Sequence, residues 1–235
     1  MKILSIECST VPVSAAVINE GEVLGFALSN VKLTHSQTLF PIIKSALDAA
    51  KLGVCDIDAV SVAVGPGSFT GIRIGISSAK GIAQPKDLKC VGVSTLLSAA
   101  YMFTNENAII CPVIDARCGQ VYNALFSSQS GKITRLCEDR AIMADELINE
   151  LKNIPNQKII LCCDAAETIF KSLADKDNII LAPKPLILQN AVGVGFCAYE
   201  RIKCSDYTNS AGLIPKYLKL PQAERELKEK QMKGL

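Results

Sequence analysis

Gly65-Pro66-Gly67-Ser68-Phe69-Thr70-Gly71-Ile72-Arg73-Ile74-Gly75 is the stretch of sequence from which the fold is inferred. It follows the apolar run at 59–64, Ala-Val-Ser-Val-Ala-Val, which is typical of a buried strand. The Gly-Pro-Gly sequence predicts a tight turn, after which Ser68 or Thr70 can cap a helix that runs to about Ala83. A strand, a glycine turn and a helix in this order predict an α/β protein and can present backbone N–H groups to an anion.

The glycine turn matches neither of the common phosphate-binding signatures. A P-loop has Lys followed by Ser or Thr after its last glycine, whereas Ile72 and Arg73 follow Gly71 here. The dinucleotide fingerprint separates its glycines by one and then by two residues, whereas three residues separate Gly67 from Gly71. Two interpretations therefore stay open, an anion site and a turn with a purely structural role. The candidate residues of the anion site are Gly65, Gly67, Ser68 and Thr70.

The helix after the turn has small residues at every fourth position, which places them along one stripe. These residues are Gly71, Gly75, Ala79 and Ala83. Glycine inside a helix costs about 1 kcal/mol relative to alanine, and a sequence tolerates this cost where another backbone comes close. The stripe therefore packs tightly on its own sheet or contacts a helix of a partner subunit, and we assign it to a partner interface.

Two further features extend this predicted interface. Leu39, Ile43 and Leu47 form an apolar helical stripe, which is most simply part of the core. It becomes interface if this helix lies beside the small-residue helix and the two exposed helices meet two more in a bundle. Arg73 lies next to the small-residue stripe, where it can pair with an acid of the partner, with a phosphate or with an acid of its own chain. All four residues are included in the predicted interface.

The composition argues against autonomous nucleic-acid binding, export and membrane insertion. The net charge of +2 gives no basic footprint, and with no Trp and 5% aromatic residues a base-stacking surface is not expected. The N-terminal stretch lacks the apolar core of a signal peptide, and no apolar run approaches the roughly 20 residues of a membrane helix, so we expect a cytoplasmic protein. Ten cysteines without a Cys-x-x-Cys spacing predict free thiols, and a single His excludes a His-rich metal site.

The order of the predicted elements in residues 1–105 repeats in residues 106–221, which indicates an internal duplication. Each half reads strand-strand-strand-helix-strand-helix-strand-helix. In the first half we expect strands at 3–9, 13–18, 22–29, 59–64 and 89–92 and helices from the cap Thr38 to residue 50, at 69–83 and at 94–104. In the second half we expect strands at 109–115, 121–126, 132–137, 158–163 and 178–181 and helices at 145–152, 165–173 and 189–203. Residues 222–235 form a charged tail.

Two duplicated βββαβαβα lobes are typical of the actin-like ATPase fold, whose ribonuclease H-like lobes flank a nucleotide cleft. Glu7 and Asp115 end the first strands of the two halves. In kinases of this fold, acids at these positions serve Mg²⁺ or act as a base, whereas the alternative is that both accept hydrogen bonds from turn amides. We assign both acids, with the glycine turn, to a vestigial nucleotide or anion site. An ATP-dependent kinase or ATPase is the alternative function.

The eleven residues at 65–75 resemble the sequence G-P-G-S-F-T-G-x-R-I-G of the bacterial TsaB (YeaZ) family. The opening at 3–10 resembles the family's I-L-x-I-D-T-S-T, with Glu7 in place of Asp. Residues 92–96 are similar to G-V-S-T-L, and His35 begins a segment similar to H-s-x-x-L-x-P.

Two motifs extend the resemblance to the end of the second half. Residues 114–122 resemble x-D-A-R-x-G-x-V-Y, and 215–219 resemble P-x-Y-L-R, with Lys219 in place of Arg. The motifs therefore span nearly the whole chain, although residues 137–209 contain none of them.

The resemblance implies an actin-like fold and a role in making N6-threonylcarbamoyladenosine at position 37 of tRNAs that read codons beginning with A. It implies a non-catalytic scaffold that binds and activates the catalytic paralogue TsaD, with the ATPase TsaE joining the complex. It also implies a homodimer that a TsaD heterodimer replaces, through the helices of the N-terminal lobe. Contact with tRNA is expected only through the complex. No cofactor is expected to bind this chain tightly, and ATP is used by the complex.

Two residues agree with a non-catalytic role. In TsaD, two His four residues apart hold a metal, and the equivalent positions here are Thr95 and Ala99. A metal needs imidazole or carboxylate ligands at such a spacing, so neither a metal site nor metallopeptidase activity is expected. We expect His35 to be solvated, with a role as ligand or base as the alternative.

Overall fold

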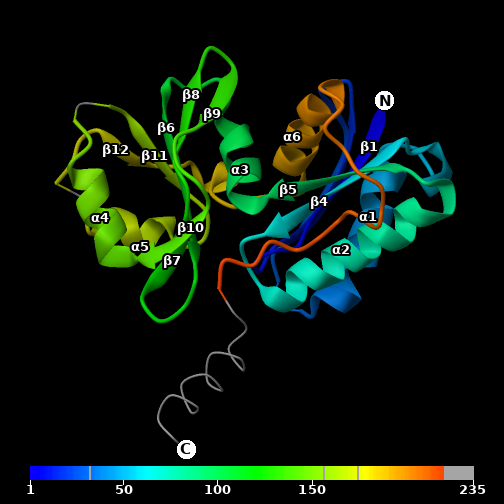
Figure 1. The fold of residues 1–235 in the computed structure, drawn as a ribbon, viewed down its shortest axis with the longest axis horizontal. Helices are drawn as coiled ribbons and strands as arrows, with labels where there is room; N and C mark the ends of the chain where they lie inside the picture. Colours follow the sequence, from blue (N-terminus) through cyan, green and yellow to red (C-terminus); the bar gives the residue numbers. More distant parts are fainter. Residues whose placement is uncertain (32, 156, 174, 220–235) are drawn as a thin grey trace, which may run out of the picture.

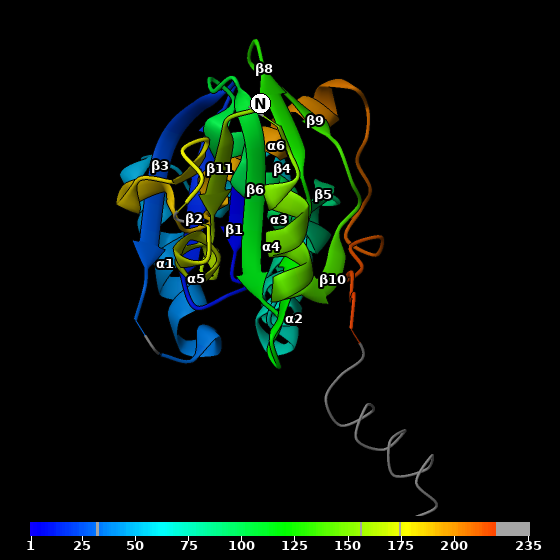
Figure 2. The ribbon, with the colours of Figure 1, turned by 90° about the vertical axis from the view of Figure 1, so that its left-hand side faces the viewer.

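The computed structural model describes residues 1–31, 33–155, 157–173 and 175–219, which fold into two α/β lobes side by side (Figure 1). Figure 2 shows the molecule turned so that the second lobe faces the viewer. The predicted charged tail at 222–235 lies outside the described residues.

The first lobe is built on a five-stranded sheet with the order β3-β2-β1-β4-β5. Its strands are β1 (Lys2–Glu7), β2 (Val13–Asn19), β3 (Glu22–Ser29), β4 (Ala59–Gly65) and β5 (Lys89–Ser94). α1 (His35–Ala49) and α2 (Phe69–Ala83) cover one face, and α6 (Ala191–Lys203) covers the other. Since side chains alternate between the faces of a strand, Leu4 and Ile6 of β1 pack under α1 and α2, whereas Ile3 packs under α6.

The second lobe contains a sheet with the order β10-β7-β6-β11-β12, in which β8 also pairs with β6 and with β9. Its strands are β6 (Ala108–Asp115), β7 (Gln120–Asn123), β8 (Phe126–Gln129), β9 (Lys132–Arg135), β10 (Arg140–Met143), β11 (Ile159–Cys162) and β12 (Ile179–Leu181). α4 (Ala144–Lys152) and α5 (Ala166–Lys171) cover one face, and α3 (Thr95–Ala100) covers the other. Short 3-10 turns occur at Val54–Asp56, Gln84–Lys86, Tyr101–Phe103 and Lys184–Leu186.

The last helix of each half packs on the sheet of the other half. α3 follows the first sheet in sequence but lies in the core of the second, with Leu96 near Phe126. α6 follows the second sheet but lies in the core of the first, with Val194 near Ile3. α3 and α6 also pack against each other, so the two helices form the layer between the sheets. Each lobe in space therefore includes a helix from the other of the two predicted ranges, 1–105 and 106–221.

The glycine turn and its helix form as predicted. α2 runs from Phe69 to Ala83, and the Ser68 side chain accepts a hydrogen bond from Gly71 N at 3.2 Å. All ten cysteines are free thiols, as their spacing predicts.

The predicted start of the first helix is wrong by several residues. The cap is Thr34, whose carbonyl accepts bonds from the amides of Gln37 and Thr38 at 3.0 and 3.2 Å, so α1 begins at His35. Pro41 then lies inside the helix, where it cannot donate to the carbonyl of Gln37. Pro41 is exposed, so solvent can satisfy that carbonyl.

The second half opens with more strands than the three predicted. The long strand β6 pairs with β7 through 113–115 and with β8 through 108–110. The predicted strand at 121–126 is therefore divided into two strands, β7 and the start of β8. Between these pairings, the side-chain amide of Asn123 donates to Pro112 O at 3.0 Å. β10 adds a further strand beside β7. The second half therefore departs from the three-strand opening of the first half, because β6 pairs with β7 along one part and with β8 along another.

Candidate functional site at the lobe junction

A cavity of about 410 Å³ lies where the two lobes meet. The first lobe contributes the end of β1, the start of α1 and the glycine turn, and the second lobe contributes the ends of β6 and β11. The last described segment of the chain closes one side. The polar lining residues are Ser9, Thr10, His35, Ser68, Asp115, Arg117, Tyr122, Asp164, Lys216, Tyr217 and Lys219.

The glycine turn lies at this cavity, but the chain itself uses much of its hydrogen-bonding capacity. Ser68 N donates to Ser9 O at 2.6 Å, and Gly71 N donates to the Ser68 side chain. Gly67 is needed because a Cβ there would overlap the carbonyl of Ser9, and a Cβ on Gly65 would lie 2.6 Å from the carbonyl oxygen of Lys216. Two of the amides that would bind an anion are therefore already bonded, and Thr70 is exposed beside them.

The two predicted acids do not converge on the cavity. Glu7 is fully buried beneath it, where Oε1 accepts a bond from Ser9 N at 2.6 Å and Oε2 has no hydrogen-bond partner. Burial raises the pKa of Glu7 to about 7, although the hydrogen bonds of Ser9 oppose this shift. Asp115 lies at the cavity, where it accepts a bond from Arg117 N at 2.8 Å and pairs with the Arg117 guanidinium at 3.4 Å.

A third acid, Asp164, lines the cavity and was not predicted. Its Oδ1 accepts a bond from Asp115 N at 3.1 Å, and burial is the main reason that its pKa is raised. Asp164 lies just after the end of β11, and Glu7 and Asp115 are the last residues of their own strands. An acid at the end of a buried strand was therefore the signal in the sequence. His35 lies nearby and its Nε2 bonds with Thr10 O at 2.7 Å, which fixes the ring between α1 and β1 rather than leaving it solvated.

Arg73 contacts two aromatic side chains of its own chain. Its Nε donates to the Tyr217 hydroxyl at 2.9 Å, and its guanidinium lies 3.8 Å from the centre of the Phe69 ring. Phe69 and Tyr217 stack with ring centres 4.4 Å apart. Lys219, two residues on, donates to Ala116 O at 2.8 Å. The segment 217–219 thereby connects the start of α2 in the first lobe to the second lobe.

The small-residue stripe packs on its own sheet, so its assignment to a partner interface is wrong for the isolated chain. A Cβ on Gly71 would overlap the carbonyl of Cys8, and a Cβ on Gly75 would lie 2.6 Å from Cys8 Sγ. Ala79 and Ala83 are fully buried in the same core. The apolar stripe of α1 is core as well, and its residues Leu39, Ile43 and Leu47 are at most 5% exposed. Of the residues assigned to the interface, Arg73 alone is exposed.

A different set of small residues faces outward from α2. Thr70, Ser77 and Gly81 are exposed and Ile74 is half-buried, at the spacing of one helix face. A Cβ on Gly81 would meet nothing within 4 Å. α1 contacts α2, so the outer sides of the two helices form one surface, to which Phe40 of α1 adds a ring that is 56% exposed.

Comparison with known proteins identifies the family. The family described as "TsaD: tRNA N6-adenosine threonylcarbamoyltransferase" matches residues 22–227. The "tRNA threonylcarbamoyladenosine biosynthesis protein TsaB" of Bacillus subtilis is 30% identical over 98% of this chain and 100% of its own length. The protein of the same name from Escherichia coli is 35% identical over 64% of this chain and 65% of its own length. This chain belongs to the TsaB (YeaZ) family.

Solved structures confirm the predicted fold. YeaZ from Pseudomonas aeruginosa superposes with a TM-score of 0.79 at 22% identity, over 92% of this TsaB-family chain and 99% of that one. Component A of the Acidaminococcus fermentans (R)-2-hydroxyglutaryl-CoA dehydratase superposes with a TM-score of 0.55 at 12% identity, over 86% and 99%. The fold is the two-lobed actin-like ATPase fold. No helix in the described part of the chain is long and apolar enough to cross a membrane.

The two positions that the resemblance equates with the TsaD metal ligands are core residues in this chain. Thr95 and Ala99 lie on α3 and are at most 3% exposed. Across the described ranges, no group of three His, Cys, Asp or Glu side chains is placed to hold a metal ion. The Thr95 hydroxyl is buried and has no hydrogen-bond partner among the described residues.

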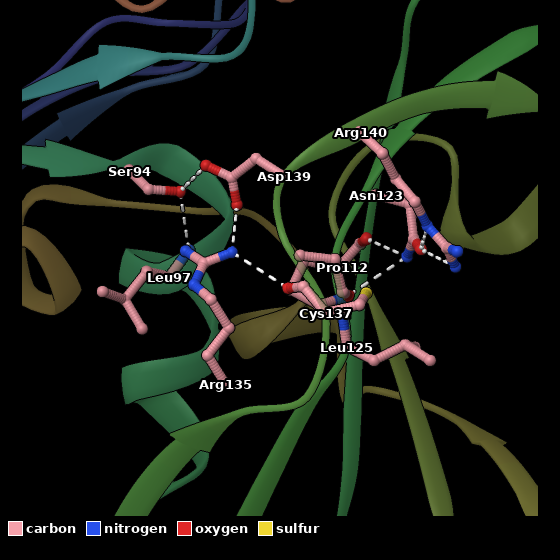
Figure 3. A network of polar contacts seen from close by, with 10 residues as sticks. Ser94, Leu97, Pro112, Asn123, Leu125, Arg135, Cys137, Asp139 and Arg140 are labelled. Carbon is pink, nitrogen blue, oxygen red and sulfur yellow. Dashed lines mark hydrogen bonds and ion pairs between the residues drawn. The ribbon is translucent and has the colours of Figure 1, made fainter.

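A polar network joins the lobes at the start of α3 (Figure 3). Ser94 caps α3 by accepting a bond from Leu97 N at 3.3 Å, and its hydroxyl donates to Asp139 Oδ2 at 2.7 Å. Arg135 pairs with the other oxygen of Asp139 at 2.6 Å. Ser94 ends β5 of the first sheet and Asp139 belongs to the second lobe, so the network fixes the crossing between the lobes.

Proposed function

We propose that the chain is a non-catalytic subunit in forming the threonylcarbamoyl group on adenosine 37 of tRNAs that read codons beginning with A. In this proposal it binds and activates a TsaD-type catalytic subunit in the cytoplasm. A TsaE-type ATPase joins the complex, which uses ATP, and tRNA is contacted only through the complex. The names of its relatives support a part in threonylcarbamoyladenosine biosynthesis. The geometry of the site supports the role of a non-catalytic subunit.

The observation that supports a non-catalytic role most directly is the position of Glu7. Catalysis by the acid at the end of β1 would need its carboxylate to face the cavity, but Glu7 is fully buried beneath it and bonded to Ser9 N. The amides of Ser68 and Gly71 are bonded within the chain as well. These amides of the glycine turn and of the start of α2 are therefore used within the chain.

The outward face of α2 supports the binding role. Thr70, Ile74, Ser77 and Gly81 give a face of small and medium side chains, on which a second helix can approach closely. A glycine at an exposed helix position lowers helix stability by about 1 kcal/mol relative to alanine, and Gly81 makes no close contact within the chain that would explain it. We infer that the partner's helices pack on this face.

The test is association with a TsaD-type protein that has the His-x-x-x-His pair. Calorimetry on the two purified proteins is expected to show a stoichiometric complex, and the complex with the ATPase is expected to modify tRNA where the isolated chain does not. Absence of association, or modification of tRNA by the TsaD-type protein at the same rate without this chain, would contradict the proposal.

A second candidate function is an ATP-dependent kinase or ATPase, which the cavity with Asp115, Asp164 and Lys219 favours. Nucleotide titration of the isolated chain distinguishes the two candidates. Turnover of ATP that an Asp164→Asn variant loses would support the enzyme, whereas binding without turnover would leave the subunit role in place.

A further inference from the structure

The last described segment of the chain, residues 206–219, crosses from the first lobe to the second. It follows α6 and forms no helix or strand within these residues. Figure 1 shows the segment, coloured orange to red, ending between the two lobes. Its last four residues, 216–219, line the cavity at the lobe junction. The segment therefore forms one side of the cavity, and the strength of its attachment decides whether that side can open.

Up to Lys216, the segment is fixed to the first lobe. Thr208 exchanges two backbone hydrogen bonds with Cys90 of β5, at 2.7 and 2.8 Å. Leu213 is 1% exposed and lies in the core that α1 and α2 cover. Lys216 N then donates to Val64 O, near the end of β4, at 2.8 Å. Backbone pairing and core burial of this kind resist local opening.

After Lys216, the attachment changes from backbone to side chains. Tyr217 and Leu218 are each 38% exposed, and neither makes a backbone hydrogen bond with any residue that the structure describes. Segments with exposed side chains and few backbone hydrogen bonds are those that open locally at a low cost in free energy. Residues 217–219 can therefore move while the rest of the segment stays on the first lobe.

Tyr217 is held by two side chains of α2 that lie one turn apart. Its ring stacks on Phe69 with the ring centres 4.4 Å apart. Its hydroxyl accepts a hydrogen bond from Arg73 Nε at 2.9 Å, and the Arg73 guanidinium lies 5.8 Å from the centre of the Tyr217 ring. Stacking and cation–π contacts at an exposed position are individually weak. They can break and form again without a change in the backbone of α2.

Lys219 makes the attachment to the second lobe. Its Nζ donates to Ala116 O at 2.8 Å and to Gln120 Oε1 at 2.6 Å, both at the turn from β6 to β7. The ammonium group of Lys lies on a flexible four-carbon stem, so this contact also breaks without a change in the turn. Ala116 lines the cavity and is only 5% exposed, so it is covered where the segment reaches the second lobe.

We propose that residues 217–219 form a latch that opens and closes one side of the cavity. The structure shows the closed form, with the Tyr217 ring on α2 and the Lys219 side chain on the β6–β7 turn. In the open form both contacts are broken while Lys216 stays on β4. Opening exposes Ala116 and admits solvent and small polar ligands to the acids that line the cavity.

The latch goes beyond the proposed function, because all of its contacts lie within one chain and its opening needs no partner subunit. Phe69 and Arg73 lie beside the outward face of α2, which Thr70, Ser77 and Gly81 form. A substitution on that face therefore tests the partner, whereas a substitution of the latch tests the cavity.

Thiol labelling of a cysteine beneath the latch tests the proposal. In a background with the exposed Cys55, Cys118 and Cys204 changed to Ser, Ala116→Cys places a thiol at the covered position. Its rate of reaction with N-ethylmaleimide is measured by mass spectrometry and divided by its rate in urea. Cys197, which is fully buried under α6, reports unfolding in the same molecules. With the latch intact, the introduced thiol is expected to be protected at least tenfold less than Cys197.

Substitutions in the segment distinguish the latch from its fixed part. Tyr217→Ala is expected to speed labelling of the Ala116→Cys thiol at least tenfold and to leave labelling of Cys197 unchanged. Tyr217→Phe, which keeps the stacked ring and loses the hydroxyl, should speed it less. Tyr207→Ala is the matched control, since that ring is 43% exposed, lies against Lys89 and belongs to the fixed part. Unchanged labelling in Tyr217→Ala, or equal acceleration by Tyr207→Ala or at Cys197, would overturn the proposal.

A tryptophan on the latch tests it without any change in the second lobe. The chain contains no Trp, so Tyr217→Trp provides a single fluorophore that stacks on Phe69. Arg73→Ala in this variant is expected to increase quenching by acrylamide at least twofold, because it removes one of the two contacts that hold the ring. Lys80→Ala is the control, since Lys80 Nζ donates to Ala211 O in the fixed part at 3.4 Å. Quenching that Arg73→Ala leaves unchanged, or that Lys80→Ala raises as much, would contradict the latch.

Discussion

Gly71 and Cys8 are in direct contact across the boundary between α2 and β1. The Cys8 thiol donates to Gly71 O at 3.0 Å, and a Cβ on Gly71 would overlap the carbonyl of Cys8. The helix after the glycine turn therefore lies directly on the end of the central strand. This internal contact alone requires a glycine at position 71.

Gly71→Ala is expected to destabilise the isolated chain by about 1–3 kcal/mol, because the new methyl group must displace either the helix or the strand. Gly81→Ala is the matched control, since the same added methyl group meets nothing within 4 Å. There, replacing a helical glycine is expected to raise the free energy of unfolding by up to about 1 kcal/mol. Urea unfolding of both variants under one set of conditions gives the comparison. Equal stability of the two variants would show that the contact with Cys8 is not tight.

The spacing of α2 showed that small residues form a stripe but not which way the stripe faces. The direction depends on where the helix lies on the sheet, which is a tertiary property. A signal was nevertheless present, because Ile72 and Ile76 lie next to the glycines and are buried with them. Bulky apolar residues beside a small-residue stripe favour packing on the chain's own sheet.

Glu7 is expected to make the stability of the chain depend on pH near neutrality. Its pKa is raised from 4.5 to about 7 by burial, so the folded chain holds this proton more tightly than the unfolded chain does. The stabilising contribution is fully present below pH 4.5 and is lost as the pH rises through 7, by about 3 kcal/mol in total.

Urea unfolding between pH 5 and pH 8 measures this loss against the variant Glu7→Gln. Glutamine cannot ionise, so the difference between the two proteins isolates the titration of position 7. The stability of the wild-type chain relative to the variant should decrease with rising pH in this window. A difference that is constant, or that increases with pH, would mean that Glu7 is ionised in the folded protein.

Ser94 and Asp139 are expected to stabilise the chain cooperatively. Ser94→Ala removes both the cap of α3 and the bond to Asp139, whereas Asp139→Ala also leaves the half-buried Arg135 without its carboxylate. A double-mutant cycle removes the separate effects and gives the energy of the contact itself, which we expect to be about 1 kcal/mol. Thermal unfolding of the four proteins measures it. Additive effects of the two substitutions would show that the crossing between the lobes does not depend on this bond.

Most of the fold follows from the sequence, whereas the site does so only in part. The motif at 65–75 and the repeated element order predicted the strands, the helices and the duplicated lobes because hydrophobic periodicity is local. The cavity is instead assembled from the ends of β1, β6 and β11 and from the segment 216–219. The burial of Glu7 and the approach of Asp164 depend on how these ends meet, and no local pattern specifies that.

Gly81→Leu is expected to weaken association with a TsaD-type subunit by at least tenfold without weakening the fold. A glycine allows a partner helix to approach within the distance of close packing, and an added side chain at this exposed position holds it away. Asn149→Leu, at an exposed position of α4 in the second lobe, adds a similar side chain away from the proposed surface and is the control. Calorimetric titration of each variant with the partner gives the affinities, and urea unfolding shows whether both chains remain as stable as the wild type. If Gly81→Leu binds with unchanged affinity, the outward face of α2 is not where the partner docks, even where the complex itself forms.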